Sequence, residues 1–489
     1  MSDLPWLSWS TIGWSLHLFL ALTVSVRVIM KRPPTGVALA WLLLIHGAPG
    51  IGVVLYLLIG ERRIGRQRFQ RMQSVRTDFR KIADEAIRQG LTDIDWSRLE
   101  PAAKSLSRLG RSIVGAPTVR GSSLTLYSST DEILQSIAAD IDAAKTSVLI
   151  EFYIWSEGGH ADEVLEAVIR AAERGVKCCV LVDALGSHPW WRSKQPDRLR
   201  QAGVELRKAL PVGLFRTLFD RTDLRLHRKI VVVDGHVAWT GSLNMVDPRY
   251  FKQDAGVGQW IDAMVRAQGS VVVPLAATMI GDWMLETGDP LKELIERHQL
   301  KMVEEQGEVD LQVVPSGPGE GKDGLLQMIL TLINTACEEL VLTTPYLIPD
   351  DSLLHALRGA AGRGVNVKLI VPERVDSFMT RYASRSYFDD LLDAGVQLYL
   401  YRDGLLHTKS ITVDGKLAMF GTVNLDMRSL FLNYEVALFI YNSEFTKLLR
   451  ELQGQYLSDS DEVNREEWGE RSFHDRFLEN TLRLMSPLL

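Results

Sequence analysis

Residues 227–235 read HRKIVVVDG, and residues 407–415 read HTKSITVDG. Both stretches fit the pattern H-x-K-x4-D, and each is followed at the same distance by G-[ST]-x-N, at residues 241–244 and 421–424. A single H-x-K is most often an ordinary piece of strand, because three-residue patterns recur by chance. The full pattern occurring twice indicates a duplicated fold in which each copy supplies one histidine motif.

The sequence around the motifs repeats as well. Strand-like runs at 148–154 and 340–344 open the two copies, and a helical pattern follows each of them. Later helical patterns end near Gly203 and Gly395, matched positions where a left-handed backbone conformation favours glycine. Strands that alternate with helices predict an α/β fold with largely buried sheets. We therefore expect a pseudo-twofold pair of α/β units, with any shared site at their interface.

The length and composition agree with this organisation. The chain has 489 residues, whereas one domain usually has about 100–200. The formal net charge of -6 does not favour a general polyanion binder, although a local basic patch remains possible. The three cysteines form no CxxC or Cys/His pattern, so we expect neither a disulfide framework nor a zinc site.

The first sixty residues predict a transmembrane helical hairpin. The apolar runs at about 10–30 and 37–59 each reach the ~20 residues that a helix needs to cross a bilayer. Pro49, which has glycines on both sides, should kink or thin the second span. A cleaved signal peptide fits less well, because no Lys or Arg precedes the first run and a second apolar run follows at once. A buried hairpin of the protein core is the other alternative.

Basic residues predict the orientation of the hairpin. Eight arginines and lysines lie between residues 62 and 81, against Lys31 and Arg32 in the short loop between the spans. This excess places the C-terminal bulk on the cytoplasmic side, and two spans return the N-terminus to the same side. The mixed apolar and basic segment at 206–225 fits an interfacial segment beside the site, and it fits a surface helix with one face in the core equally well.

The motif spacing indicates phosphate ester chemistry. Residues two apart on a strand face the same side, so His227 points with Lys229 and His407 points with Lys409. A neutral imidazole can attack phosphorus, and a second imidazole can protonate the leaving oxygen. The two ammonium groups can hold the non-bridging oxygens as negative charge builds up. The two motifs are near twins, so their sequences leave open which histidine attacks.

Asp234 and Asp414 complete the two motifs and belong to the set of candidate catalytic residues. They have the opposite strand parity to the histidines and precede a glycine in a D-G turn, so we expect an orienting or structural role first. We expect four neutral side chains to contact the substrate, namely Ser242, Asn244, Thr422 and Asn424. No carboxylate cluster suited to Mg²⁺ is evident in the sequence, so protein groups could supply all of the charge stabilisation.

The two motifs resemble the signature of the phospholipase D superfamily. Further stretches at 244–260, 344–346, 405–410 and 421–429 resemble bacterial cardiolipin synthases, and the resemblance runs nearly end to end. It implies two duplicated phospholipase D-type α/β/α sandwich domains behind the N-terminal hairpin. The expected parts are the hairpin at 1–60, a basic juxtamembrane connector at 61–120, a first domain at 121–305 with its motif at 222–249, and a second domain at 306–489 with its motif at 402–429 and an amphipathic C-terminal tail.

The resemblance also implies a reaction. Two phosphatidylglycerol molecules become cardiolipin and free glycerol through a phosphohistidine, without a metal or a nucleotide. The family resemblance assigns the nucleophile to His227 and the acid and base steps to His407. The expected partners are these anionic phospholipids and the bilayer, with no nucleic acid. The expected location is the bacterial inner membrane, as a multi-pass protein with its catalytic domains in the cytoplasm.

Asp262 and Glu435 are candidates for orienting the histidines. Members of the superfamily often carry an acidic residue near these positions that orients a catalytic histidine, as in other carboxylate–histidine pairs. An ordinary solvated acid at a strand end explains either residue equally well.

Two other functions remain open from the sequence. A membrane-anchored phospholipase D-type phosphodiesterase would use the same motifs with water as the acceptor, acting on phospholipid or, less expectedly, on nucleic acid. A catalytically inactive membrane scaffold is the third hypothesis, although both motifs are complete. The hairpin favours a lipid substrate over nucleic acid.

Overall fold

The computed structural model describes residues 9–33, 35–60, 65–211, 223–318 and 323–486. The chain forms two compact units, an N-terminal unit that ends at Arg66 and a large body that contains both motifs. Most of the interfacial segment expected at 206–225 lies outside the described residues.

The N-terminal unit consists of one long apolar helix and a broken apolar segment. Its elements are α1 (Trp9–Lys31), α2 (Thr35–Gly47), α3 (Ile51–Leu55) and the short π-helix η1 (Tyr56–Gly60). Residues Thr11–Lys31 are long and apolar enough to cross a membrane. The second apolar run is interrupted between α2 and α3, next to Pro49. Ala21, Val24 and Val28 of α1 pack against apolar residues of this broken segment, while large apolar side chains elsewhere on α1 are exposed.

The body is built around one sheet of fifteen strands. The order is β19-β13-β12-β10-β15-β16-β18-β9-β1-β8-β6-β5-β2-β3-β4. The first repeat contributes β1 (Thr118–Tyr127), β2 (Ser147–Phe152), β3 (Lys177–Asp183), β4 (Glu205–Ala209), β5 (Ile230–Val233), β6 (Val237–Gly241) and β8 (Met264–Gly269). The second contributes β9 (Val309–Ser316), β10 (Glu339–Thr343), β12 (Asn366–Pro372), β13 (Gln397–Tyr401), β15 (Ser410–Val413), β16 (Leu417–Gly421), β18 (Glu435–Ile440) and β19 (Ser460–Glu462).

The strand order reads the same outward from the centre in both directions, apart from the added edge strand β19. The antiparallel pair β1 and β9 joins the repeats, and β8, β6, β5, β2, β3 and β4 on one side match β18, β16, β15, β10, β12 and β13 on the other. This arrangement confirms the predicted duplication and pseudo-twofold symmetry. The first repeat begins with β1 at Thr118, slightly before the expected boundary at 121.

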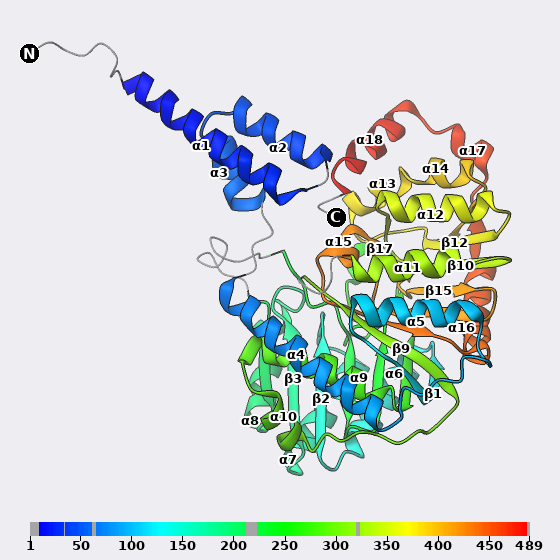
Figure 1. Cartoon of the computed structure of the whole chain (residues 1–489). Coiled ribbons are helices and arrows are strands. Elements are labelled where there is room, and N and C mark those ends of the chain that lie inside the picture. Colours follow the sequence, from blue (N-terminus) through cyan, green and yellow to red (C-terminus); the bar gives the residue numbers. More distant parts are fainter. Residues whose placement is uncertain (1–8, 34, 61–64, 212–222, 319–322, 487–489) are drawn as a thin grey trace, which may run out of the picture. The chain divides into compact units, whose positions relative to one another are not determined.

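Helices cover both faces of each half of the sheet (Figure 1). The body contains α4 (Arg66–Arg88), α5 (Pro101–Ile113), α6 (Thr130–Asp142), α7 (His160–Glu173), η2 (Trp190–Arg192), α8 (Gln195–Gln201), η3 (Gln253–Ala255), α9 (Val272–Thr287) and α10 (Leu291–His298) before β9. After β9 follow α11 (Gly324–Asn334), α12 (Asp351–Gly362), α13 (Phe378–Arg385), α14 (Phe388–Asp393), α15 (Met427–Phe431), α16 (Ser443–Ser458), α17 (Arg465–Gly469) and α18 (Phe473–Arg483). The predicted α/β/α sandwich is therefore confirmed in both repeats.

The connector helix α5 and the C-terminal helix α18 both pack against the second repeat. The connector helix α5 packs into the apolar core of the second repeat through Ala103 and Leu106. The amphipathic tail forms α18, which packs on α13 and leaves Phe473 and Phe477 exposed with their rings stacked at 6.2 Å. The two repeats and these helices belong to one compact unit.

Short pairings carry each histidine motif to the opposite repeat. The backbone before His227 runs beside Tyr434, because Leu226 and Tyr434 form a parallel bridge and the His227 N–H donates to the Tyr434 carbonyl at 2.9 Å. In the same way β14 (Leu405–Leu406) pairs with β7 (Trp260–Ile261), and the His407 N–H donates to the Ile261 carbonyl at 2.8 Å. A further short pair joins β11 (Leu347–Ile348) to β17 (Leu425–Asp426). The two histidines consequently lie where the repeats meet.

Candidate active site

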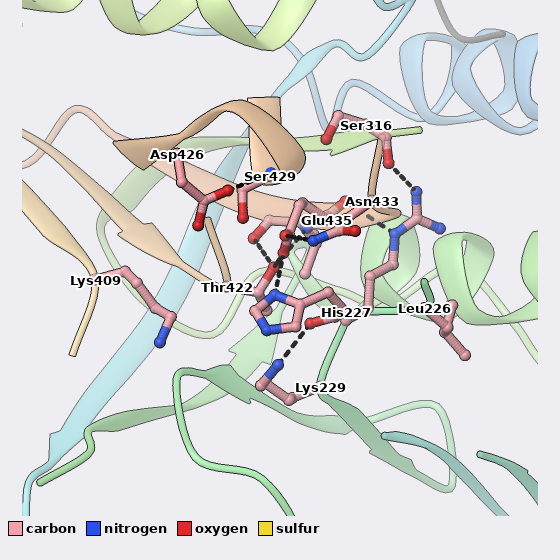
Figure 2. Close-up of polar contacts among 12 residues, drawn as sticks. Leu226, His227, Lys229, Ser316, Lys409, Thr422, Asp426, Ser429, Asn433 and Glu435 are labelled. Atoms are coloured by element: carbon pink, nitrogen blue, oxygen red, sulfur yellow. Dashed lines mark hydrogen bonds and ion pairs between the residues drawn. The ribbon is translucent and has the colours of Figure 1, made fainter. Parts of the chain in front are cut away.

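Each motif histidine is held by a carboxylate from the other repeat. The Nδ1 atom of His227 lies 2.9 Å from Oε2 of Glu435, and Nδ1 of His407 lies 2.7 Å from Oδ1 of Asp262. Both imidazoles and both carboxylates are buried. A carboxylate can only accept, so each Nδ1 carries a hydrogen and each Nε2 keeps its lone pair. Figure 2 shows the His227 ring between Glu435 and Lys229, with Lys409 to the left.

Close backbone contacts position the two carboxylates. Gly241 and Gly421 precede Ser242 and Thr422, and a Cβ on either glycine would lie 2.4 Å from a carbonyl oxygen of the neighbouring strand. Glycine at this point of the motif therefore permits a close approach. The Thr422 hydroxyl donates to Oε2 of Glu435 at 2.5 Å, while the Ser242 hydroxyl accepts from the Ala263 N–H at 3.0 Å.

The two motif lysines lie buried beside the histidines. The Nζ atom of Lys229 donates to the His227 carbonyl at 2.7 Å, and Nζ of Lys409 donates to the His407 carbonyl at 2.5 Å. Burial lowers the pKa of Lys229 to about 8, although nearby carboxylates oppose this shift. Burial lowers the pKa of Lys409 well below its ordinary value, and the neighbouring Lys229 acts in the same direction. Two poorly solvated cations at one place would gain strongly from a bound anion.

Both histidines are neutral at neutral pH in the free protein. Burial lowers the pKa of His227 and of His407 to about 4, and the lysines add to this effect. The partner carboxylates act in the opposite direction, and the pKa values of Glu435 and Asp262 lie below their ordinary values despite burial. The arrangement therefore combines two neutral nitrogen nucleophiles with two ionised carboxylates that can stabilise an imidazolium.

Asp234 and Asp414 lie away from both imidazoles, at the far ends of the motif strands. Strand β5 separates Asp234 from His227, and β15 separates Asp414 from His407. The Asp234 carboxylate accepts from the backbone N–H groups of 145–147, and Asp414 accepts from those of 337–339. Burial raises the pKa of Asp234, but these backbone hydrogen bonds outweigh it and hold the pKa below its ordinary value. Both aspartates thus fix the turns that precede β2 and β10.

The four neutral candidates fall into two groups. Ser242 and Thr422 lie beside the carboxylates, as described above, and so support the histidines indirectly. The Asn244 amide oxygen accepts from the Ile154 N–H at 3.2 Å. The Asn424 amide oxygen is buried and has no hydrogen-bond partner within the described part of the chain. Among the four, Asn424 is therefore the one whose side-chain oxygen has no hydrogen-bond donor within the described part of the chain.

Two aromatic rings beside the histidines were not among the sequence candidates. The Tyr153 ring lies 5.0 Å from the His227 ring, and the Trp260 ring lies 4.4 Å from the His407 ring. Tyr153 directly follows β2, which pairs with the motif strand β5, and Trp260 lies two residues before Asp262. These positions were the available signals in the sequence.

A buried charge cluster supports the first motif. The Arg228 guanidinium contacts the Asp282 carboxylate and donates to the carbonyls of Glu435 and Ser316, each at 2.9 Å. Because Glu435 and Ser316 belong to the second repeat, Arg228 also ties the two repeats together. Across the described ranges, no group of three His, Cys, Asp or Glu side chains is arranged to hold a metal ion.

Comparisons with known proteins identify relatives across the whole chain. A family model described as "Cardiolipin synthase, PLD-like domain" matches residues 137–264 and 329–455, and one described as "Phospholipase_D-nuclease N-terminal" matches residues 19–61. The chain is 42% identical over 485 residues to cardiolipin synthase A of Serratia proteamaculans, covering 98% of this chain and 99% of that protein. It is 41% identical over 483 residues to cardiolipin synthase A of Proteus mirabilis, covering 99% of each.

A solved structure supports the fold. The phosphatidylserine synthase of Haemophilus influenzae aligns with a TM-score of 0.61 and 16% sequence identity, covering 79% of this chain and 100% of that chain. At this level of identity the likeness concerns the fold alone. It agrees with the duplicated α/β/α architecture.

Replacing Glu435 with Gln is expected to lower the pKa of His227 further. Burial already holds this pKa near about 4, and the Glu435 carboxylate raises it by stabilising the imidazolium. Without that charge, the imidazole stays neutral to a lower pH. Histidine-selective ¹⁵N NMR of the protein in detergent micelles, titrated with acid, measures the shift. Asp262→Asn is the matched control, since it should shift His407 and leave His227 unchanged; an increased pKa for His227 in Glu435→Gln would contradict the pairing.

Replacing Asp414 with Ala is expected to destabilise the fold and leave the histidine titrations unchanged. The substitution removes the acceptor of three backbone N–H groups, which costs roughly 1–3 kcal/mol. Thermal melting in detergent measures the loss, and Asp414→Asn should lose less because the amide oxygen still accepts. An altered His407 titration with an unchanged melting temperature would instead place Asp414 in the site.

Proposed function

The chain belongs to the cardiolipin synthase family of phospholipase D-like proteins, and from this premise we propose that it transfers a phosphatidyl group between two phosphatidylglycerol molecules, giving cardiolipin and glycerol. The observation that carries the proposal is the pair of crossed His–carboxylate contacts with two buried lysines beside them. Such a site suits a phosphodiester because it offers a nucleophile, an acid and two cations.

In the first step, the neutral Nε2 of His227 attacks the phosphorus of one phosphatidylglycerol. The P–O bond to glycerol breaks as the P–N bond forms, and His407 gives a proton to the leaving glycerol oxygen. The bound phosphodiester anion and Asp262 stabilise the protonated His407, whose pKa is about 4 in the free protein. Glu435 likewise stabilises the positive charge that develops on His227.

The second step reverses the first with a different alcohol. His407, now neutral, accepts the proton of a hydroxyl group on the second phosphatidylglycerol. The hydroxyl oxygen attacks the phosphorus, the P–N bond breaks, and His227 returns to its neutral form. Lys229 and Lys409 hold the non-bridging oxygens in both steps, and no net proton is gained or lost.

The remaining candidates support this machinery. Thr422 and Ser242 hold the carboxylate side of the site, and Asn424 presents its amide oxygen to a substrate hydroxyl. Asp234 and Asp414 act through the turns that position β2 and β10 and take no chemical part.

The membrane is the natural location of the substrates. The apolar helix α1 and the match of residues 19–61 to an N-terminal family model support membrane association. We propose that α1 and the broken segment from α2 to η1 both cross the bilayer, so that the N-terminus and the body lie on the same side. The excess of basic residues at 62–81 favours the cytoplasmic side of the inner membrane. We also expect the basic residues at 62–81, which follow the second span in the sequence, to attract the headgroups of anionic lipids. The net charge of -6 gives no support for a nucleic acid substrate.

Purified protein with phosphatidylglycerol in detergent micelles is expected to form cardiolipin and glycerol in equal amounts, read by mass spectrometry. His227→Ala should reduce this rate by at least about a hundredfold, because it removes the group that forms the covalent intermediate. His236→Ala is the matched control, since this exposed turn residue lies outside the site, and its rate should stay within about twofold. Phosphatidic acid without cardiolipin would favour a phospholipase D-type phosphodiesterase instead.

Thiol labelling in spheroplasts tests the topology. Cys337 is exposed in the body, whereas Cys178 and Cys179 are buried, so Cys337 reports where the body lies. A membrane-impermeant maleimide should label neither Cys337 nor an N-terminal Ser2→Cys until the membrane is permeabilised. Labelling of Ser2→Cys alone in intact spheroplasts would mean a single span, and labelling of Cys337 would place the body outside.

A further inference from the structure

We propose that Arg225 and Arg428, one from each repeat, form a second phosphate site that binds the phosphodiester group of the acceptor lipid. This proposal rests on the proposed function and extends it to substrate choice. The acceptor differs from water and from glycerol in carrying its own phosphodiester, which lies one glycerol unit from the attacking hydroxyl. A site that favours lipid over water therefore needs an additional anion-binding group near the histidines.

Arg225 lies on the same side of the backbone as His227. Residues 225–227 are extended beside Tyr434, since Leu226 bridges Tyr434 and the Tyr434 N–H donates to the Arg225 carbonyl at 2.8 Å. Alternation along an extended segment places the side chains of Arg225 and His227 on one side, about 7 Å apart at the backbone. This separation is comparable to the length of one glycerol bridge between two phosphates.

Arg428 approaches the same place from the second repeat. Its guanidinium donates to the Asp223 carbonyl, two residues before Arg225. Burial raises the pKa of Tyr153 to about 12, while the charges of Arg225 and Arg428 both act to lower it. Both guanidinium groups therefore act on one tyrosine, whose ring lies 5.0 Å from the His227 ring.

Neither arginine is in an ion pair with any described residue, in contrast to other arginines near the site. Arg228 is paired with Asp282, and Arg249 with Asp247 and Asp131. Arg225 and Arg428 are half-buried, and their hydrogen bonds go to the backbone carbonyls of Leu224 and Asp223.

The nearby carboxylates of Asp183 and Asp426 already have other partners. Asp183 accepts from the N–H groups of Leu185, Gly186 and Leu226, and Asp426 accepts from the Ser429 N–H at 2.7 Å. The two guanidinium groups thus keep donors for a further anion, and a guanidinium can bind phosphate with two parallel hydrogen bonds.

The arginine pair departs from the pseudo-twofold symmetry of the site. Arg225 lies two residues before His227, and the matching residue before His407 is Leu405, which is fully buried against Trp260. Arg428 lies four residues after Asn424, and the residue at that distance after Asn244 is Pro248. On the other side, the Lys252 ammonium lies 5.5 Å from the Trp260 ring, but it is paired with Asp376. The two arginines that form no ion pair with a described residue therefore both lie on the side of His227. Besides the reacting phosphate, the reaction has one further phosphate to bind, namely that of the acceptor lipid. A single additional cationic site is sufficient for it.

Two reactions of the same enzyme test the site. Cardiolipin formation needs a phosphate-bearing acceptor, whereas exchange of labelled glycerol into phosphatidylglycerol uses the same histidines with an acceptor that has no phosphate. Arg225→Gln and Arg428→Gln should each reduce cardiolipin formation roughly ten- to a hundredfold, because each removes a charged hydrogen-bond donor. Glycerol exchange should stay within about twofold of the unaltered enzyme, and a larger share of the phosphatidyl groups should go to water as phosphatidic acid.

Matched variants separate binding from folding. Arg225→Lys and Arg428→Lys keep the charge and should recover part of the cardiolipin activity. They replace the Gln variants in the test if a Gln variant has a lowered melting temperature. Arg402→Gln, at the far edge of the sheet beside Asp461, should leave both reactions unchanged. An equal loss of exchange and cardiolipin formation would overturn the proposal, as would unchanged cardiolipin formation. Failure of the unaltered enzyme to make any cardiolipin would instead overturn the proposed function.

Discussion

The crossed contacts between histidine and carboxylate are the constraint on which the rest of the body depends. His227 needs Glu435, which is 208 residues away, and His407 needs Asp262, which is 145 residues away. Neither repeat can therefore orient its own imidazole. The central pair β1–β9, the two short pairings that precede the histidines and the Arg228 contacts all hold the repeats in register. A loss of register would separate both imidazoles from their carboxylates at once.

Burying so many ionisable groups at one place is costly, and the site offsets this cost only in part. Each carboxylate is compensated by a hydrogen-bonded histidine and by a nearby lysine, and its pKa stays low. The lysines have no ion-pair partner within the described ranges, and burial holds their pKa values below the ordinary range. The charges of the two lysines and the two carboxylates balance, but neither ammonium group is in an ion pair with a described residue; each donates to a backbone carbonyl. A bound phosphodiester anion supplies a direct partner for both ammonium groups, so substrate binding also relieves the cost of burying them.

The sequence predicted the features that depend on local pattern. Repetition of the motifs predicted the duplicated fold. The alternation of side chains along a strand predicted that Asp234 and Asp414 point away from the imidazoles. Pro49 predicted the break in the second apolar run. Partner choice across the repeats could be reached only through family resemblance, because Asp262 and Glu435 look like ordinary acids at strand ends. The packing of α5 into the second repeat could not be predicted at all, since an amphipathic pattern does not specify which core the helix covers. Tyr153, Trp260 and the arginine pair likewise depend on which strands become neighbours.

Duplication creates a further difficulty, because two equivalent histidines would have no reason to take different roles. The motifs are near twins, so any difference must come from the surrounding residues. The first motif has Arg228 and Asp282 behind it, whereas the corresponding Thr408 hydroxyl contacts the Tyr456 hydroxyl at 3.0 Å. The first histidine lies against Tyr153 on the side of Arg225, and the second lies against Trp260 on the side of Leu405. A transfer reaction distinguishes its two alcohols by what they carry. The arginine pair lies on one side of the centre, whereas the cation on the other side, Lys252, is already paired with Asp376, and this difference gives the twinned centre a direction. The duplication thus supplies the two sets of reacting groups, and the residues that differ between the repeats determine how a substrate is recognised.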